Sequence, residues 1–322
     1  MRAVQVSRFD GPEAVGLVEV PEAEGRPDQV VIEVEMAGVS FPDLLLTRGE
    51  YQVRPALPFV PGAEVAGVVR IVPEGSVFSP GDRVAAFPGL GAFAEVVVAD
   101  PVAVFPLPGA MSFEVGACLP MNYLTAHFAL ALRGRLQAGE TVLVHGAAGG
   151  VGTAAIQMAK ALGARVIGVA SSEKKAEVAR AAGADEVVGV EGFKEAAKEL
   201  TGGRGVDVVV DPVGGDRFAD SLRSLAVGGR LLVIGFTAGE IPTVKVNRLL
   251  LNNVEVVGVW WGAYWLRDPS YLARQWSELM ALLPTGHIDP PIGGIFPLEQ
   301  AADALNEIAS RRATGKILLR TR

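Results

Sequence analysis

The stretch Thr141–Gly152, TVLVHGAAGGVG, limits what this chain can fold into more than any other. A β-branched apolar run passes directly into a turn of small residues. An Ala-rich segment with helical character follows, and Gly163 marks its predicted end. Strand, glycine turn and helix in this order present backbone N–H groups and the positive end of a helix to a phosphate.

The spacing of the glycines in this turn matches a dinucleotide fingerprint. Gly149 and Gly150 would let a pyrophosphate approach the backbone, and Gly152 would let the helix lie close to the strand. Glycine turns also join strands to helices for structural reasons alone, so the surrounding pattern has to decide between the two interpretations.

The pattern around the turn is a strand–helix repeat. The predicted strands are near-continuous Val/Ile/Leu runs at Thr141–His145, Arg165–Ala170, Glu186–Val190, Val206–Asp211, Arg230–Gly235 and Val254–Val259. The predicted helices between them are Thr153–Leu162, Glu173–Ala182, Phe193–Leu200 and Arg217–Leu225. Such runs are typical of a parallel sheet covered by helices on both faces, so the sequence predicts a doubly wound α/β dinucleotide-binding domain.

The first 120 or so residues have a different character. Short β-branched runs, such as 29–37 and 65–71, alternate with Gly/Pro turns, which predicts a small barrel. Ser40 is the expected N-cap of a short helix, Phe41–Thr47. The helices and the last strand expected after Trp261 have no place in the parallel sheet, so we expect the tail to return to the first domain.

Composition narrows the class of protein. A chain of 322 residues predicts about two domains, and 50% hydrophobic residues can form large cores. A net charge of −7 argues against a general nucleic-acid or membrane binder. The single cysteine, Cys118, and the lack of a signal-like or membrane-spanning apolar run predict a cytoplasmic protein.

The segment after the second strand of the repeat predicts the cofactor. NAD-selective folds usually place an acidic residue at the tip of this strand, but here the strand ends in Ser171 and Ser172. Lys174 and Lys175 lie in a first helical turn, where cations oppose the helix dipole. A 2′-phosphate bound by Ser171 and Lys175 would remove that conflict, which favours NADPH; two solvated surface lysines are the alternative.

The residues that bind metals in proteins are too few and too scattered for a zinc site. His127, His145 and His287 lie far apart in the chain, and Cys118 stands alone. His145 ends a buried strand and is expected to pack rather than act as a base.

Taken together, these motifs resemble the medium-chain dehydrogenase/reductase superfamily, and within it the zinc-independent quinone oxidoreductases related to zeta-crystallin. The matching stretches run nearly from end to end: AGVSFPDLLLTRGEY (37–51), FVPGAEVAGVV (59–69), PGDRVAAF (80–87), GAFAEVVV (91–98), LTA (124–126), HGAAGGVG (145–152), GVDVVVDPVGG (205–215) and GKILL (315–319). Where the zinc-dependent branch carries Cys and His ligands, this chain has Ser40 and Ala63, although Glu64 is kept.

The resemblance implies a Rossmann domain, residues 123–266, inserted into a GroES-like β-barrel domain formed by residues 1–122 and 267–322. It also implies an active site in the cleft between the two domains. The residues it assigns to NADPH are Ser40, Thr125, Gly149, Gly150, Val151, Gly152, Ser171, Lys175, Val213, Gly235, Phe236, Trp260 and Arg312.

The implied reaction is hydride transfer from NADPH to a quinone or an activated alkene, an enone or alkenal. A reduced quinone is readily protonated by water, whereas an enolate needs a proton donor or oxyanion stabilisation. Ser40 and Tyr51 are the predicted catalytic residues, since related enoyl thioester reductases use a Tyr in the loop that matches Arg48–Tyr51. A Tyr that only packs over the cleft mouth is the alternative role, and Asp43 is expected to fix the backbone.

A second function class stays open, an NADPH-binding protein with little turnover. The last strand of the repeat is followed by exposed-looking aromatic residues, Trp261, Tyr264 and Trp265. Edge strands of this kind invite pairing with another copy, which predicts a homodimer.

Overall fold

The computed structural model describes residues 1–322, which divide into two compact units. Unit 1 comprises Met1–Met121, Pro269–Ala273 and Ile292–Arg322, and unit 2 comprises Asn122–Asp268 and Arg274–Pro291. Both ends of the chain therefore contribute to unit 1. The tail does not return as one piece, because the segment 274–291 belongs to unit 2 and not to the barrel domain that the sequence assigned it to.

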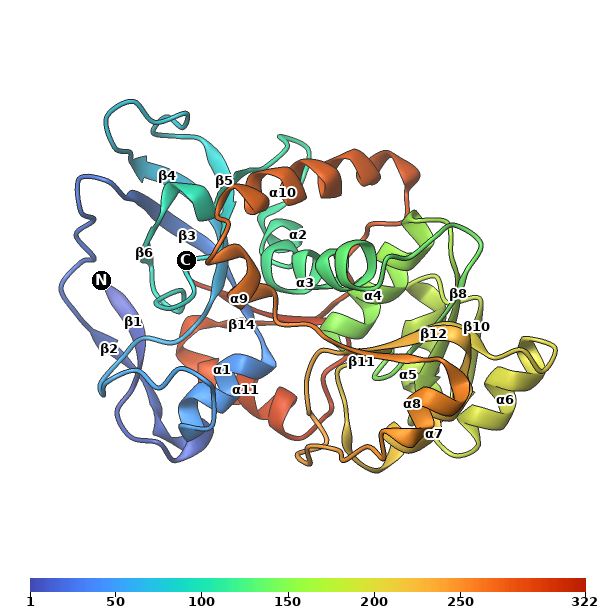
Figure 1. Ribbon diagram of the computed structural model, residues 1–322. Helices are drawn as coiled ribbons and strands as arrows, with labels where there is room; N and C mark the ends of the chain where they lie inside the picture. Colours follow the sequence, from blue (N-terminus) through green and yellow to red (C-terminus); the bar gives the residue numbers. More distant parts are fainter. The chain divides into compact units, whose positions relative to one another are not determined.

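Unit 1 is the β-rich, GroES-like unit (Figure 1). Its main sheet has seven strands in the order β14-β15-β3-β4-β5-β7, and β6 also pairs with β3. These strands are β3 (Val30–Val39), β4 (Glu64–Ile71), β5 (Arg83–Ala86), β6 (Val96–Ala99), β7 (Val104–Pro106), β14 (Ile292–Pro297) and β15 (Lys316–Arg320). β1 (Arg2–Val6) and β2 (Val15–Glu19) form a separate antiparallel pair, and the helices are α1 (Phe41–Arg48), α2 (Phe113–Gly116) and α11 (Ala301–Ala309).

The last strand of the chain lies next to the longest strand of unit 1. β15 pairs antiparallel with β3, and Ile317, Leu319 and Ala37 are buried in the core of that sheet. The prediction that the final strand returns to the first domain is therefore confirmed by its pairing.

Unit 2 is built on a six-stranded sheet in the order β10-β9-β8-β11-β12-β13, with every neighbouring pair parallel. The strands are β8 (Thr141–Val144), β9 (Arg165–Ala170), β10 (Glu186–Gly189), β11 (Val206–Asp211), β12 (Leu225–Val233) and β13 (Glu255–Gly258). This is the strand order of the doubly wound dinucleotide-binding fold, with β8 first in sequence and central in space. The predicted fold class is confirmed.

Helices lie on both faces of this sheet (Figure 1). α4 packs against α5, and α6 packs against α7. The helices of the repeat are α4 (Gly150–Ala161), α5 (Glu173–Ala181), α6 (Phe193–Leu200), α7 (Phe218–Ser224) and α8 (Asn247–Asn252). The others are α3 (Leu124–His127), α9 (Trp261–Trp265) and α10 (Ser270–Leu282).

One helical run, Phe113–Arg133, is long and apolar enough to cross a membrane, with a mean hydropathy of 1.3. The run combines α2 and α3 with π-helical turns at Leu119–Tyr123 and Phe128–Arg133. Because 72% of its most apolar window is buried within the protein, its apolar residues are those of a core helix.

Two local expectations are wrong. β12 begins at Leu225, where the sequence predicts the end of a helix, because Leu225 pairs with Val206 before the ladder shifts register and resumes at Arg230. The sequence indicates that Trp261 is exposed, but its exposed fraction is 4%. Its indole Nε1 donates to Gln275 Oε1 at 2.9 Å, so the polar atom of the buried ring has a partner. Tyr264 is the exposed aromatic residue of this segment, at 38%.

His145 occupies the end of β8 as a buried, neutral side chain. Its Nε2 lies 2.8 Å from Ser221 Oγ, and its ring meets Phe193 edge-on with centroids 4.9 Å apart. Burial, together with the charge of Arg217, lowers the pKa of His145 from 6.5 to about 3. His145 is thus a packing residue, as the sequence indicates.

We predict that His145 makes folding pH-dependent. Since its pKa is lower in the folded state, the unfolded chain binds the extra proton below pH 6.5, and stability falls as the pH drops toward 3. The loss should be about 1.4 kcal/mol for each pH unit over that window. Urea unfolding at pH 7.5 and pH 5 should show a smaller decline for His145→Gln than for the wild type. Equal declines would contradict the prediction, and the exposed His287→Gln serves as the control.

Candidate functional site

The carboxyl edge of the sheet in unit 2 gathers most of the residues that the sequence predicts for a dinucleotide. In parallel strands all carboxyl ends meet at one edge, and ligands bind where the strand order reverses. Here the order reverses at β8, which lies between β9 and β11. The loops that follow β8, β9, β11, β12 and β13 carry Gly149–Gly152, Ser171–Lys175, Val213, Gly235–Phe236 and Trp260, respectively.

The glycine turn after β8 fits a pyrophosphate. α4 begins at Gly150, and its N-cap, Gly149, provides no side-chain hydrogen bond to the first turn. A Cβ built on Gly149 would meet only the carbonyl oxygen of Gly146, at 3.4 Å. The first-turn N–H groups of a helix of 12 residues are therefore not capped by the side chain before it.

Gly152 has a structural task in the same turn. A Cβ on Gly152 would lie 2.1 Å from the carbonyl oxygen of Gly146, so only glycine lets α4 approach the end of β8 this closely. On the other side, Gly150 lies against Asn122, whose amide nitrogen a Cβ would meet at 2.5 Å. Asn122 is 4% exposed, and the sequence analysis missed it because nothing in its local pattern marks it.

The loop after β9 presents polar groups beside that turn. Ser172, not Ser171, is the N-cap of α5, and its Oγ accepts from the backbone N–H of Lys175 at 3.4 Å. Ser171 is exposed, Lys175 is half-buried, and no acidic side chain stands at the tip of the strand.

The remaining predicted residues of unit 2 lie around the other loops. Asp211, at the end of β11, accepts from the N–H groups of Val213 and Gly214, both at 2.9 Å, and so shapes the loop. The ring of Phe236 lies against Gly214, where a Cβ would meet it at 2.9 Å. Trp260 is 58% exposed. Thr125 is half-buried on α3, which packs against α4.

Unit 1 holds a buried polar cluster, formed by Ser40, Asp43, Glu64 and Lys316. The strand register brings it together: Gly38 of β3 is paired with Glu64 of β4, and Val39 is paired with Ile317 of β15. Ser40 follows Val39 and Lys316 precedes Ile317, so the two side chains meet. Gly38 is needed here, because a Cβ would lie 2.7 Å from the Glu64 carboxylate.

The Lys316 ammonium forms an ion pair with Glu64 Oε1 and donates to Ser40 Oγ at 2.6 Å. The other carboxylate oxygen, Glu64 Oε2, accepts from the backbone N–H of Met121 at 2.7 Å. Lys316 is 3% exposed and Glu64 is 0% exposed. Removing one partner from a pair buried this deeply typically costs about 3–5 kcal/mol, because the remaining charge is left uncompensated.

Asp43 completes the start of α1. Its Oδ2 accepts from the backbone N–H of Ser40 at 2.7 Å, which is one half of a capping box at the start of the helix, and Ser40 Oγ also accepts from Lys316. Burial raises the pKa of Asp43 to about 7. Asp43 thus holds the backbone, as the sequence predicts.

Tyr51 lies on the edge of a small apolar cluster. It packs against the buried side chains Val6, Leu46 and Phe59. Burial, and then the charge of Asp43, raises the pKa of its phenol. Tyr51 therefore combines a packed ring with a hydroxyl that stays protonated at neutral pH.

Arg312, a predicted cofactor residue, forms an ion pair within its own segment of the chain. It is exposed in unit 1, and its Nη2 lies 2.8 Å from Glu307 Oε1. Lys316 and Asn122 are the two polar residues of the site regions that sequence reasoning missed. The motif GKILL was recognised, but a lysine at the start of a strand gives no sign of being buried.

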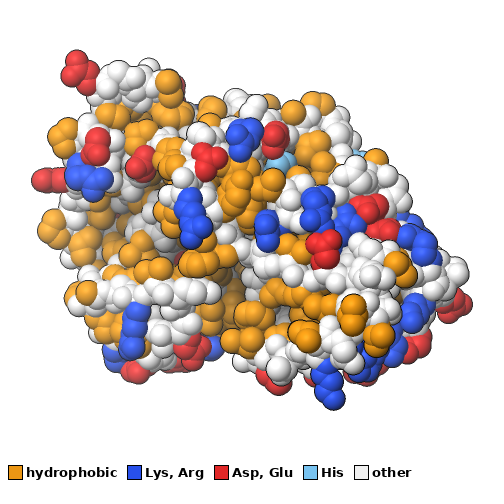
Figure 2. Space-filling view, in the orientation of Figure 1, with side chains coloured by type: hydrophobic (Ala, Val, Ile, Leu, Met, Phe, Trp, Pro, Cys, Tyr) orange, Lys and Arg blue, Asp and Glu red, His pale blue; other side chains and the backbone are white.

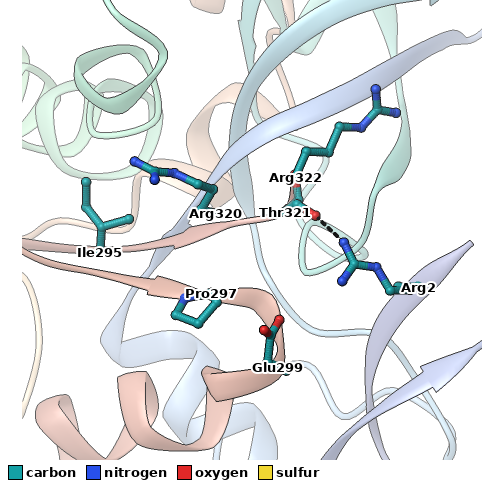
Figure 3. Close-up of a pocket in the computed structure, with 7 residues that line it drawn as sticks. All are labelled: Arg2, Ile295, Pro297, Glu299, Arg320, Thr321 and Arg322. Atoms are coloured by element: carbon teal, nitrogen blue, oxygen red, sulfur yellow. Dashed lines mark hydrogen bonds between the residues drawn. The ribbon is translucent and has the colours of Figure 1, made fainter.

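A surface hollow of about 240 Å³ on unit 1 lies at the other end of β15 (Figure 3). It is lined by Arg2, Arg320 and Arg322 together with Glu299, Thr321 and two apolar residues. Each arginine faces a carboxylate: Arg2 lies 2.7 Å from Glu95, Arg322 lies 3.0 Å from Glu33, and Arg320 lies 3.8 Å from Glu114. The arginine charges are compensated, so we do not assign this hollow a ligand.

No group of three or more His, Cys, Asp or Glu side chains in the chain is arranged to hold a metal ion. At the two positions where the zinc-dependent branch has its ligands, this chain has Ser40, which accepts a hydrogen bond from the Lys316 ammonium, and Ala63, whose side chain has no ligand atom. Glu64, the residue after Ala63, forms the ion pair with Lys316.

Comparison with known proteins agrees with this geometry. Residues 26–109 match the alcohol dehydrogenase GroES-like domain family, and residues 150–283 match the zinc-binding dehydrogenase family. Bovine quinone oxidoreductase-like protein 2 is 41% identical over 305 residues, which cover 94% of this chain and 87% of that protein.

Two solved structures are similar over the whole chain. A probable oxidoreductase from Mycobacterium abscessus shares 45% identity with a TM-score of 0.92, covering 100% of this chain and 99% of that one. Escherichia coli quinone oxidoreductase, solved in complex with NADPH, shares 32% identity with a TM-score of 0.92, covering 100% of both chains.

We predict that Gly152→Ala destabilises the protein by about 1–3 kcal/mol, because the added methyl forces α4 away from the end of β8. The measurement is the thermal unfolding midpoint, with Gly189→Ala as the matched control. Gly189 ends strand β10 of the same unit, and a Cβ there would lie 3.7 Å from the carbonyl oxygen of Glu191, an ordinary van der Waals distance. Equal midpoints for the two variants would show that the close approach is not needed.

Proposed function

This chain belongs to the quinone oxidoreductase-like family of medium-chain dehydrogenases/reductases and is an oxidoreductase enzyme, and we propose that it transfers a hydride from NADPH to a quinone or an activated alkene. The observation that carries the proposal is the carboxyl edge of the sheet in unit 2. There the uncapped start of α4, the acid-free loop after β9 and the loop shaped by Asp211 lie on adjacent strands.

The residues present fit a nicotinamide dinucleotide. The N–H groups of Gly150, Val151 and Gly152 would hold the pyrophosphate, and Val213, Gly235 and Phe236 would border the nicotinamide ribose. When bound, the reduced nicotinamide supplies the hydride, and the protein's task is to position the acceptor and stabilise charge.

NADPH is favoured over NADH by the loop after β9. Ser171 would donate a hydrogen bond to a 2′-phosphate, and Lys175 would supply a positive charge. No carboxylate stands at the strand tip to bind a free ribose hydroxyl or to repel the phosphate.

The acceptor is proposed to meet Ser40 and Tyr51. Both can donate a hydrogen bond at neutral pH, and the raised pKa of Tyr51 keeps its phenol protonated. Reduction of a quinone would need little stabilisation from either donor. Reduction of an enone would need a hydrogen bond from one of them to stabilise the negative charge that develops on the enone oxygen. We also propose that the reaction needs no metal, since the Lys316 ammonium already pairs with Glu64.

The proposal is tested by incubating the purified protein, in a buffer that contains a chelator, with 1,2- and 1,4-quinones, alkenals, enones and enoyl thioesters. Loss of NADPH absorbance is the readout, and NADH is run in parallel. We expect turnover of at least one class with kcat/KM higher for NADPH. Tight NADPH binding with no turnover would instead favour a binding protein without catalysis, and equal kcat/KM for the two cofactors would refute the NADPH assignment.

In the same assay, Lys175→Ala should reduce the preference for NADPH by about tenfold, the effect of losing one charge-assisted hydrogen bond. Lys174→Ala removes the same charge from the neighbouring, more exposed position and should leave the preference unchanged. If both variants keep the wild-type preference, Lys175 does not bind the 2′-phosphate.

The free edge of β13 is proposed to pair with a second copy of the chain. β13 pairs with β12 on one side only, and Val256 is exposed at 36%. Leu250, Leu251 and Leu266 nearby in sequence are 76%, 73% and 65% exposed. Figure 2 shows hydrophobic side chains at the surface over the region of α8 and β12. Exposed apolar residues beside an open strand edge favour a homodimer.

Sedimentation velocity at micromolar concentration should show a dimer for the wild type and a monomer for Val256→Lys, because a charge on an edge strand opposes pairing. Val227→Lys is the control, since Val227 lies in the neighbouring strand β12 and is 81% exposed. A monomeric wild type would refute the dimer.

A further inference from the structure

We infer that Lys316 is a positioning residue that orients the Ser40 hydroxyl as the hydrogen-bond donor for the oxygen of an enone substrate. The inference rests on the proposed function and adds Lys316, a residue to which the sequence assigned no role. Three of the four members of the buried cluster in unit 1 carry this role: Ser40, Glu64 and Lys316.

The Ser40 oxygen is held as an acceptor. Lys316 Nζ donates to Ser40 Oγ at 2.6 Å, and an ammonium group cannot accept a hydrogen bond in return. The hydroxyl proton of Ser40 must therefore point elsewhere.

The nearest acceptor for that proton is a poor one. Glu64 Oε1 lies 3.3 Å from Ser40 Oγ, which is longer than a normal O–H···O bond of about 2.5–3.0 Å. The same carboxylate oxygen is already paired more closely with Lys316. A substrate oxygen at a normal distance would compete well for the Ser40 proton.

The position of Ser40 in the chain distinguishes it from its two partners. Ser40 is the N-cap of α1 and lies where β3 passes into that helix, whereas Lys316 and Glu64 are the first residues of strands β15 and β4. The backbone N–H of Ser40 is occupied by Asp43 at 2.7 Å, so the hydroxyl is its remaining donor. Lys316 then acts on the substrate through Ser40: it polarises the hydroxyl and fixes the direction of its proton.

The chemistry defines which substrates need this donor. When an enone accepts a hydride from NADPH at its β carbon, the electron pair of its C=C π bond forms a new double bond between the α carbon and the carbonyl carbon. The product is an enolate with negative charge on oxygen. A proton from solvent then completes the saturated ketone, so Ser40 stabilises the oxyanion without being consumed. A quinone gives an anion that is readily protonated by water and should depend much less on Ser40.

The test compares one 1,4-quinone with one enone, both at saturating NADPH, for the wild type and variants. Because Lys316→Met alone would leave the Glu64 charge buried and unpaired, Lys316→Met/Glu64→Gln provides a neutral pair of similar volume. We expect this double variant and Ser40→Ala each to lose about 100-fold in kcat on the enone and less than about threefold on the quinone. Adding Ser40→Ala to the double variant should cause no further loss, because both act through one hydroxyl.

Arg320→Met is the matched control, since Arg320 is exposed on the same strand and lines the hollow of Figure 3. Its kcat values and its NADPH affinity should equal those of the wild type, and the NADPH affinity of the Lys316→Met/Glu64→Gln variant should be unchanged as well. Tyr51→Phe separates the two candidate donors: if Tyr51 alone serves the enone, this variant loses the enone activity and the double variant does not.

The remaining outcomes contradict either the role of Lys316 or the proposed function. An unchanged kcat on the enone in the folded double variant, or equal losses on both substrates, would refute the role of Lys316 while leaving the proposed function intact. If the wild-type protein reduces the quinone and not the enone, the role of Lys316 is also refuted and the proposed function is unaffected. A wild type that binds NADPH and reduces neither would refute the proposed function, and this inference with it.

Discussion

The ion pair between Lys316 and Glu64 is the interaction on which the arrangement of unit 1 depends. It joins the last strand of the chain to a strand that begins some 250 residues earlier, next to the first residue of α1. Two charges buried this completely are tolerated only when each has its partners. The carboxylate is satisfied by Lys316 and by the backbone of Met121, so this ion pair links the start of β15 to the start of β4 and lies against the Ser40 hydroxyl.

Unit 2 depends on a close approach between two backbone segments, which only a residue without a side chain allows. At Gly152 the helix after β8 comes so close to the carbonyl of Gly146 that no Cβ fits. This approach places the start of α4 at the end of the central strand, where the strand order reverses. The backbone groups that the helix cannot satisfy internally are those that we propose for a ligand phosphate.

Much of this could be predicted from the sequence because the signals are local. The Val-rich runs and the helices between them define the parallel sheet, and only their ends differ, as where β12 begins at Leu225. The glycine turn and the acid-free loop at Ser171 were recognisable for the same reason. The burial of Trp261 could not be predicted in this way. Its hydrogen-bond partner, Gln275, lies in another helix, so no local sequence pattern around Trp261 indicates that the residue is buried.

The buried cluster could not be predicted, although each of its strands was expected. Its assembly depends on register, since Lys316 reaches Ser40 only because Ile317 is paired with Val39, and Glu64 fits only because Gly38 faces it. Register follows from pairing across the sheet and not from periodicity along one strand. A lysine is also the residue type least expected in a core, so its role becomes visible only when its partners are seen. The residues that we propose for the chemistry of unit 1 are therefore those whose surroundings come from three distant parts of the chain.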